Sequence, residues 1–160
     1  MLVFVLRTSM LMLLSLASCE APPTLQQCAK LMTDQAIIER CGSPTYGNEK
    51  RTEDCFPLTK PERITGLVIR ENERSELFVG ASRVKPEMRG LTQGVWLEWS
   101  KSAEGRPPHA IQYGAYLILF EGRRSACSQP GRGLNGYGHL NQYRELAIVD
   151  HIISWTRVAD

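Results

Sequence analysis

The sequence predicts a mainly β domain, either a small OB-like barrel or a β-sandwich, with one helix at its N-terminal end. Five or six segments after Arg63 have the apolar patterns of short β-strands, and no helical pattern occurs among them. A helical spacing of apolar residues is found only before Glu39. Strands of this number and length favour a closed barrel first and a sandwich second.

The first eighteen residues, 1–18, have the pattern of a secretory signal peptide. A single positive charge, Arg7, precedes an apolar run over residues 10–16, and the segment closes on the small residues Ala17 and Ser18. A transmembrane helix needs roughly 20 apolar residues, so this run is too short to be an uncleaved membrane anchor. We therefore expect cleavage after Ser18 and export.

The residues Leu16 to Cys19 read LASC and resemble the lipobox of bacterial lipoproteins. The resemblance implies that Cys19 becomes the first residue of the mature protein. Its thiol would carry diacylglycerol and its new amino group a further acyl chain such as palmitate, and two or three acyl chains hold a protein firmly on a membrane. The residue after the cysteine is Glu20 and not an aspartate. In such lipoproteins this implies sorting to the outer membrane, with the domain facing the periplasm. An ordinary cleaved signal with a chance cysteine is the alternative.

Residues 19–24 contain two prolines and are predicted to form a short tether. We expect residues 25–160 to form a single disulfide-stabilised β-rich domain. The whole chain has 19 Lys and Arg against 17 Asp and Glu. Such a balance argues against nucleic acid as a partner, because phosphate binding needs a basic surface. The expected partners are the membrane, through the lipid, and a protein or cell-wall component.

The predicted helix covers Leu25–Glu39. Cys28 and Met32 follow Leu25 at three- and four-residue intervals, and Thr24 is suited to be the N-cap. The stretch after it, 43–60, is rich in turn formers and charge and is predicted to be a loop.

The predicted strands follow in order. Ile64–Arg70 and Glu76–Gly80 form a pair joined by the polar turn between them, and Gly94–Trp99 alternates between two faces. Tyr113–Phe120 is apolar on both faces, as a central strand is. The last segment, 145–158, reads as one long bent strand or as two. Core and barrel-rim packing is the expected role of the tryptophans Trp96, Trp99 and Trp155.

Four cysteines remain beside the lipidated one: Cys28, Cys41, Cys55 and Cys127. An even number in an oxidising compartment favours two disulfides, and four cysteines allow three pairings. The long polar stretch between Cys41 and Cys55 favours that pairing, which leaves Cys28 for Cys127. A zinc site is the alternative, but there is no C-x-x-C pair and no histidine nearby. We expect no metal and no cofactor.

The C-terminal half carries several short motifs in sequence: Gly94-Val95-Trp96, Phe120-Glu121-Gly122-Arg123-Arg124, Gly138-His139, Val149-Asp150 and Ile153-Ser154. In these motifs it resembles a group of small exported bacterial proteins and lipoproteins of unassigned function. The resemblance covers about the last 70 residues. It implies no cofactor and no reaction, and it assigns no functional residue.

The candidate binding residues lie in the most basic stretch of the mature chain. Arg123, Arg124 and Arg132 are suited to carboxylate or phosphate, and the glycines before His139 offer backbone N–H groups to an anion. His139 itself has the chemistry of an acid, a base or a metal ligand. The alternatives are a solvated charged face and a histidine that only caps its own loop.

These patterns favour a non-enzymatic envelope lipoprotein that acts as a binding module. Its expected partner is an envelope protein, peptidoglycan, or an exogenous enzyme or toxin that it inhibits, as an immunity protein does. The alternative is a small hydrolase or transferase that uses His139 and the arginines on an anionic envelope substrate. An enzyme requires convergent titratable groups in a cleft, whereas a binding protein requires an exposed apolar patch.

Overall fold

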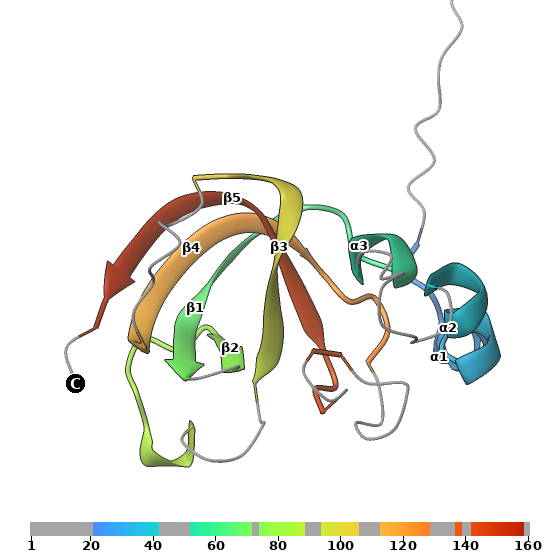
Figure 1. The fold of residues 1–160 in the computed structure, drawn as a ribbon, viewed down its shortest axis with the longest axis horizontal. Helices are drawn as coiled ribbons and strands as arrows, with labels where there is room; N and C mark the ends of the chain where they lie inside the picture. The colour runs from blue at the N-terminus through green and yellow to red at the C-terminus, as the bar shows by residue number, and fades with distance from the viewer. Residues whose placement is uncertain are drawn as a thin grey trace, which may run out of the picture.

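Five β-strands joined in a ring form the body of the molecule (Figure 1). The computed structural model describes residues 21–41, 52–71, 74–88, 94–105, 113–128, 137–138 and 142–158. The strands are β1 (Glu62–Glu71), β2 (Arg74–Val79), β3 (Val95–Glu104), β4 (Gly114–Arg124) and β5 (Leu146–Arg157). The mainly β prediction is confirmed.

The ring closes in the order β1-β2-β3-β5-β4. β1 is antiparallel to β2 and β4, and β5 is antiparallel to β4 but parallel to β3. The five strands thus form one sheet that closes into a ring, in keeping with the predicted class of small barrel or sandwich. The predicted segment 145–158 is one strand, β5, and the predicted central strand, β4, pairs on both sides.

The pairing between β2 and β3 is the shortest in the ring. It consists of two residue pairs, Glu76 with Trp96 and Leu77 with Val95. β1 and β4, by comparison, pair along the whole of Glu62–Arg70. β2 therefore extends past the start of β3, and the barrel has an opening at this end. The strand also starts earlier than predicted, because Arg74, assigned to a polar turn, is its first residue.

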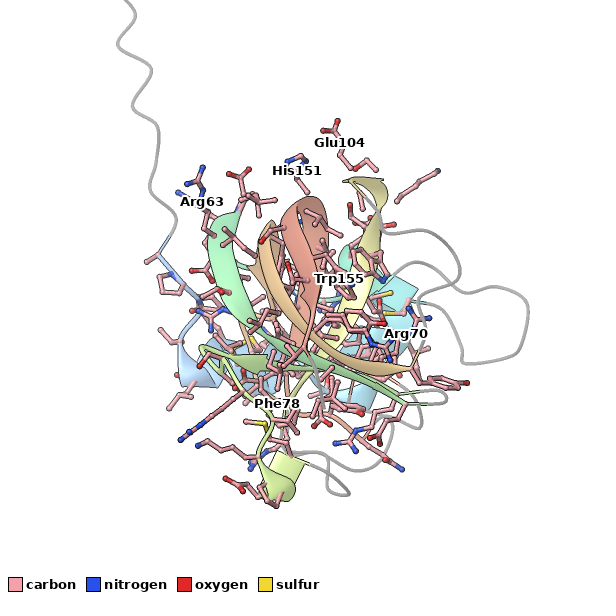
Figure 2. All side chains as sticks on the ribbon, turned by 90° about the vertical axis from the view of Figure 1, so that its left-hand side faces the viewer. Arg63, Arg70, Phe78, Glu104, His151 and Trp155 are labelled. Atoms are coloured by element: carbon pink, nitrogen blue, oxygen red, sulfur yellow. A yellow bond between two sulfur atoms is a disulfide. The ribbon has the colours of Figure 1, made fainter. Side chains whose placement is uncertain are left out.

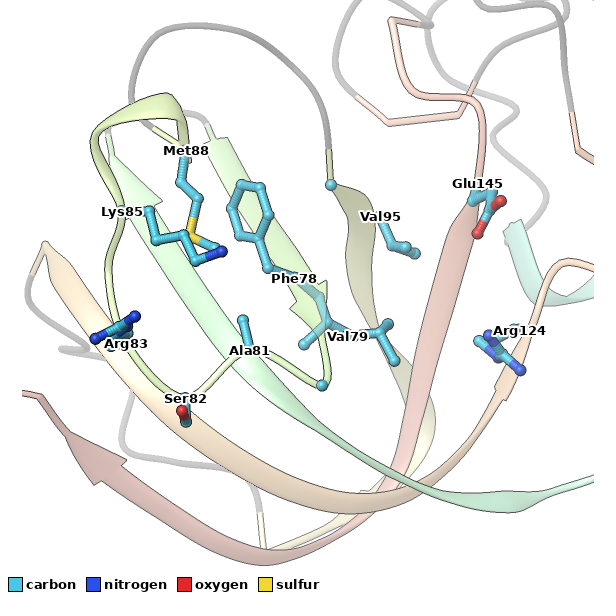
Figure 3. A pocket seen from close by; sticks show the side chains of 13 residues that line it. Phe78, Val79, Ala81, Ser82, Arg83, Lys85, Met88, Val95, Arg124 and Glu145 are labelled. Atoms are coloured by element: carbon cyan, nitrogen blue, oxygen red, sulfur yellow. The ribbon is translucent and has the colours of Figure 1, made fainter.

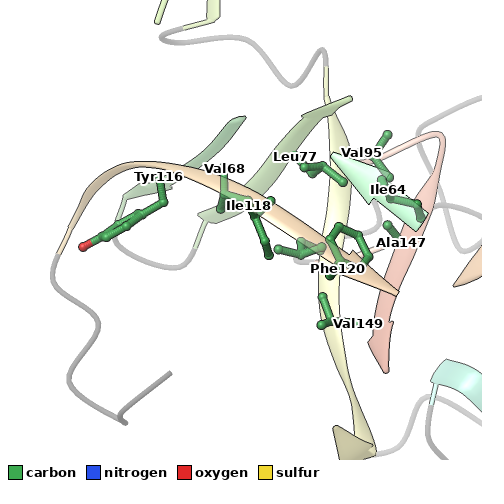
Figure 4. Close-up of a cluster of buried hydrophobic side chains, with 10 residues drawn as sticks. Ile64, Val68, Leu77, Val95, Tyr116, Ile118, Phe120, Ala147 and Val149 are labelled. Carbon is green, nitrogen blue, oxygen red and sulfur yellow. The ribbon is translucent and has the colours of Figure 1, made fainter. Parts of the chain in front are cut away.

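Alternate residues of every strand fill the inside of the ring (Figure 4). Fully burying such a side chain stabilises the fold by about 1.5–3 kcal/mol relative to leaving it exposed. Gly122 allows β4 to approach β5 closely, since an added Cβ there would lie 2.2 Å from the carbonyl oxygen of Ile148. The central members of this cluster are Val68, Leu77, Leu97, Ile118, Phe120 and Val149.

Three helices lie together beside one end of the ring (Figure 1). They are α1 (Leu25–Leu31), α2 (Asp34–Cys41) and α3 (Thr52–Cys55). Thr24 caps α1 as predicted, in a reciprocal capping box with Gln27. The single predicted helix is wrong, because it is interrupted at Met32 and Thr33, where the Thr33 hydroxyl accepts a hydrogen bond from the Ala36 N–H.

The predicted loop 43–60 is wrong where α3 forms, and its part 43–51 lies outside the described residues. None of the helices in the described ranges is long and apolar enough to cross a membrane.

A disulfide between Cys28 and Cys127 joins α1 to the segment that follows β4. The second predicted pairing is wrong in this structure, where Cys41 and Cys55 are both thiols. The side chain of Arg40 makes the link between α2 and α3 that we expected from a disulfide. Its guanidinium donates to the carbonyl oxygen of Cys55 over 2.8 Å and also to that of Leu31.

Candidate ligand-binding groove

A cavity of about 560 Å³ lies where β2 runs past the start of β3 (Figure 3). One wall is the chain from Leu77 to Met88, which ends in the 3-10 helix η1 (Pro86–Met88). The start of β3 and the residues Arg124 and Glu145 form the other. Small-molecule sites commonly enclose roughly 300–1,000 Å³, so the cavity has the size of a ligand site. We call it the groove.

Three cations line the groove, and two of them, Arg83 and Lys85, lie on the same wall. Val84, between these two residues, packs against an apolar cluster that includes Leu67 and Ile69. Val84 itself does not line the groove. Both cations are exposed. The Lys85 ammonium lies 4.0 Å from the Glu87 carboxylate, and Arg83 has no ion pair with any described residue. Within the described residues, this edge of the groove therefore carries two positive charges, one of which has a carboxylate nearby.

The floor of the groove is apolar. Phe78 and Met88 pack on the outer face of β1 and β4, and Val95 belongs to the barrel interior. Val79 has 47% of its surface exposed at the mouth. The cavity thus combines an apolar floor with a cationic edge, which suits a ligand with one charged end.

The opposite side of the groove carries one cation that is already paired and one carboxylate. Arg124 donates from Nε to the Glu62 carboxylate over 2.8 Å, and Glu145 accepts a hydrogen bond from the Ser128 hydroxyl. Among the described residues, Arg83 has no ion pair and Lys85 has only the 4.0 Å contact with Glu87, so these two supply the positive charge that is most available to a ligand.

A buried ion pair holds the walls of the groove in place. The side chain of Glu76 is fully buried, and its carboxylate binds Arg74 and accepts from the Gly94 N–H over 2.5 Å. Arg74 also donates to the carbonyl oxygen of Met88. Gly94 and Met88 both line the groove, so this one pair fixes β2, the start of β3 and η1 together. A side chain at Gly94 would not fit, because its Cβ would lie 2.5 Å from Cγ of Glu76.

The charges of Arg74 and Glu76 stabilise each other, and they also shift the pKa of a neighbouring tyrosine. Burial alone would lower the pKa of Arg74, but its hydrogen bond to Glu76 and the negative charge there raise it. Tyr143 is buried beside them, with its ring 4.9 Å from that of Trp96. Burial raises the pKa of Tyr143, and the charge of Glu76 raises it further.

Two of the three predicted binding arginines, Arg123 and Arg124, are paired with carboxylates. Arg123 makes a two-pronged contact with Asp150, at 2.9 and 2.7 Å, and reaches Glu53 of α3 at 3.2 Å. The hydrogen bond to Asp150 raises the pKa of Arg123 against the effect of desolvation. Both Arg123 and Arg124 belong to β4 and not to a loop, because β4 continues its pairing with β5 through them. Arg124 lines the groove and Arg123 does not.

Cys19, Arg132 and His139 lie outside the described residues. His151 points to Glu104, 3.5 Å away, on the far side of the strand from Asp150 (Figure 2).

The tryptophans pack as predicted. Trp99 and Trp155 lie 5.8 Å apart between ring centres, and Trp155 lies 5.0 Å from Tyr116.

Apart from Arg124, the residues that form the groove were not identified from the sequence. Arg83 and Lys85 stand in a short polar stretch with no strand or helix pattern, and their shared direction depends on Val84 being anchored. The charged pair Arg74 and Glu76 has the two-residue spacing of one strand face, a signal that both share a side. That signal does not reveal that this face is buried.

The chain matches no known protein-family profile, no curated protein and no solved structure.

Proposed function

We propose that this protein is an exported lipoprotein that is tethered to the bacterial envelope and binds an anionic ligand in the groove. The observation that carries the proposal is the pair Arg83 and Lys85, both exposed at the edge of the cavity. Among the described residues, the one carboxylate within ion-pair distance of either cation is Glu87, 4.0 Å from Lys85. Arginine and lysine side chains form strong, charge-assisted hydrogen bonds with carboxylates and phosphates.

The tether rests on the signal peptide and on Cys19 in its lipobox context. The first helix, α1, begins at Leu25, six residues after the lipidated position. A short tether of this length keeps the barrel close to the membrane surface, where the anchor would hold it.

A binding role is favoured over catalysis by the content of the groove. Its described lining includes no histidine and no cysteine, and its one carboxylate, Glu145, accepts from Ser128. The hydrolase alternative relies on His139 and Arg132, which lie outside the described residues, and on the arginines of β4. Of these, Arg123 is engaged with Asp150 and Glu53. An arginine held in this way stabilises the contact between α3 and the barrel.

Native mass spectrometry of the protein purified from envelopes tests the proposal. We expect a bound acidic compound on the wild-type protein that is lost when Arg83→Gln and Lys85→Gln are combined. The matched control is Lys60→Gln with Lys101→Gln, which removes two exposed charges away from the groove and should retain the compound. An unchanged compound on the groove variant, or none on the wild-type protein, would contradict the proposal.

A further inference from the structure

We infer that the ligand of the groove is an anionic amphiphile, a single molecule with a carboxylate or phosphate head and an apolar chain. This inference rests on the proposed function and names its ligand class. The head would bind Arg83 and Lys85, and the chain would lie over Phe78, Val79 and Met88.

The division of the lining supports this assignment (Figure 3). The cations occupy one border, on the segment 81–85, while Phe78, Met88 and Val95 present apolar surface to the same cavity. A small inorganic anion would use the cations and leave the apolar floor in water. An uncharged apolar molecule would cover the floor and leave the cations without a partner. A molecule with both parts satisfies both surfaces.

The main chain of the groove argues against a peptide strand as the occupant. The N–H of Gly80 donates to Thr65, that of Ala81 to Phe78, and that of Gly94 to Glu76. An added strand binds through a row of free main-chain donors and acceptors along a sheet edge. Three donors on the described walls of the groove are already used within the protein. An acyl or alkyl chain needs no such partners.

The mature domain is a suitable reagent for the test. The three apolar clusters and the disulfide lie between Cys28 and Val158. Removing residues 1–19 therefore takes away no described contact. It also removes the lipid, which would otherwise compete with an added amphiphile.

Isothermal titration calorimetry with dodecyl phosphate, below its micellar concentration, measures the expected interaction. Inorganic phosphate supplies the head alone and dodecyl maltoside an uncharged amphiphile, and we expect both to bind at least tenfold more weakly. Arg83→Gln with Lys85→Gln should weaken dodecyl phosphate binding at least tenfold. Val79→Asp, at the exposed mouth, should do the same, while Lys60→Gln with Lys101→Gln should leave it unchanged.

Two results would overturn the amphiphile but keep the proposed function. One is binding of inorganic phosphate or of an acidic peptide, lost with Arg83 and Lys85, where dodecyl phosphate does not bind. The other is adsorption to phosphatidylglycerol vesicles, lost with the same two residues, without binding of dodecyl phosphate. If no anionic probe depends on these two residues, both the amphiphile and the proposed function fall.

Discussion

Replacing Glu76 with alanine should destabilise the protein more than any change at the surface. Glu76 has no exposed side-chain surface, and Arg74 keeps 17% of its own. Removing one member of a buried ion pair costs about 3–5 kcal/mol, because the other charge stays buried without compensation. The remaining exposure of Arg74, and the Glu71 carboxylate 3.8 Å from it, relieve part of that charge. We therefore expect a loss near the lower limit, about 3 kcal/mol.

Two further variants separate the charge from the hydrogen bonds. Glu76→Gln keeps the size of the side chain and an oxygen that can accept from the Gly94 N–H, so we expect a smaller loss of about 1–2 kcal/mol. Arg74→Met combined with Glu76→Leu removes both charges together. Apolar replacements of a buried pair are often close to neutral, so this double variant should be more stable than Glu76→Ala.

The variants at Arg74 and Glu76 form a double-mutant cycle. Urea unfolding of the mature domain, with its disulfide intact, gives the free energy of unfolding of each variant. The single variants Arg74→Met and Glu76→Leu complete the cycle. We expect a coupling energy of at least about 1 kcal/mol between the two positions. Strictly additive effects, or a loss below about 1 kcal/mol for Glu76→Ala, would refute the reasoning from burial.

Three more predictions concern the tether, the disulfide and the buried tyrosine. Cys19→Ala should release the protein from membranes, because it removes every acyl chain, and sedimentation with membranes after a high-salt wash would contradict the lipid anchor. Cys28→Ser with Cys127→Ser opens a loop of sequence separation 99, for which chain entropy gives about 4.7 kcal/mol; an unchanged urea midpoint would contradict this. Tyr143 has a raised pKa in the folded protein, so its contribution to stability is complete below about pH 10 and is lost as pH rises through the folded value. Tyr143→Phe should therefore reduce the fall of unfolding free energy between pH 9 and about 11, and parallel curves would refute it.

The strands could be predicted because the order of apolar and polar residues along a strand shows which of its faces are buried. The alternation at Gly94–Trp99 and the continuous apolar run before Phe120 identify β3 and β4 without any knowledge of the ring. The ring closure itself depends on the parallel pairing of β3 with β5, which joins residues about 50 positions apart. No local pattern specifies that pairing.

The candidate site was harder to predict than the fold. A run of basic residues shows which charges exist but not which carboxylates reach them. Arg123 meets Asp150 only because β4 and β5 pair, and it meets Glu53 only because α3 packs beside them. The groove draws on residues from Leu77 to Glu145, and their meeting is a property of the folded ring.

The helical region shows a third kind of limit. The apolar spacing across residues 25–39 continues through the break, while the capping hydroxyl of Thr33 starts a second helix. The long polar stretch between Cys41 and Cys55 favoured a disulfide, but Arg40 provides the contact between the two helices. Both outcomes depend on single polar side chains whose partners the spacing does not show.

The most direct test of the groove as the ligand site is a map of ligand-induced changes in the backbone amide NMR spectrum. We predict that dodecyl phosphate shifts the amide signals of Leu77–Gly80, Arg83, Lys85 and Gly94–Val95, which lie on the two walls of the groove. The amides around Arg123 and Asp150 should keep their positions. Shifts centred on Arg123 and Asp150, or on the Trp99 and Trp155 pair, would contradict the assignment of the groove.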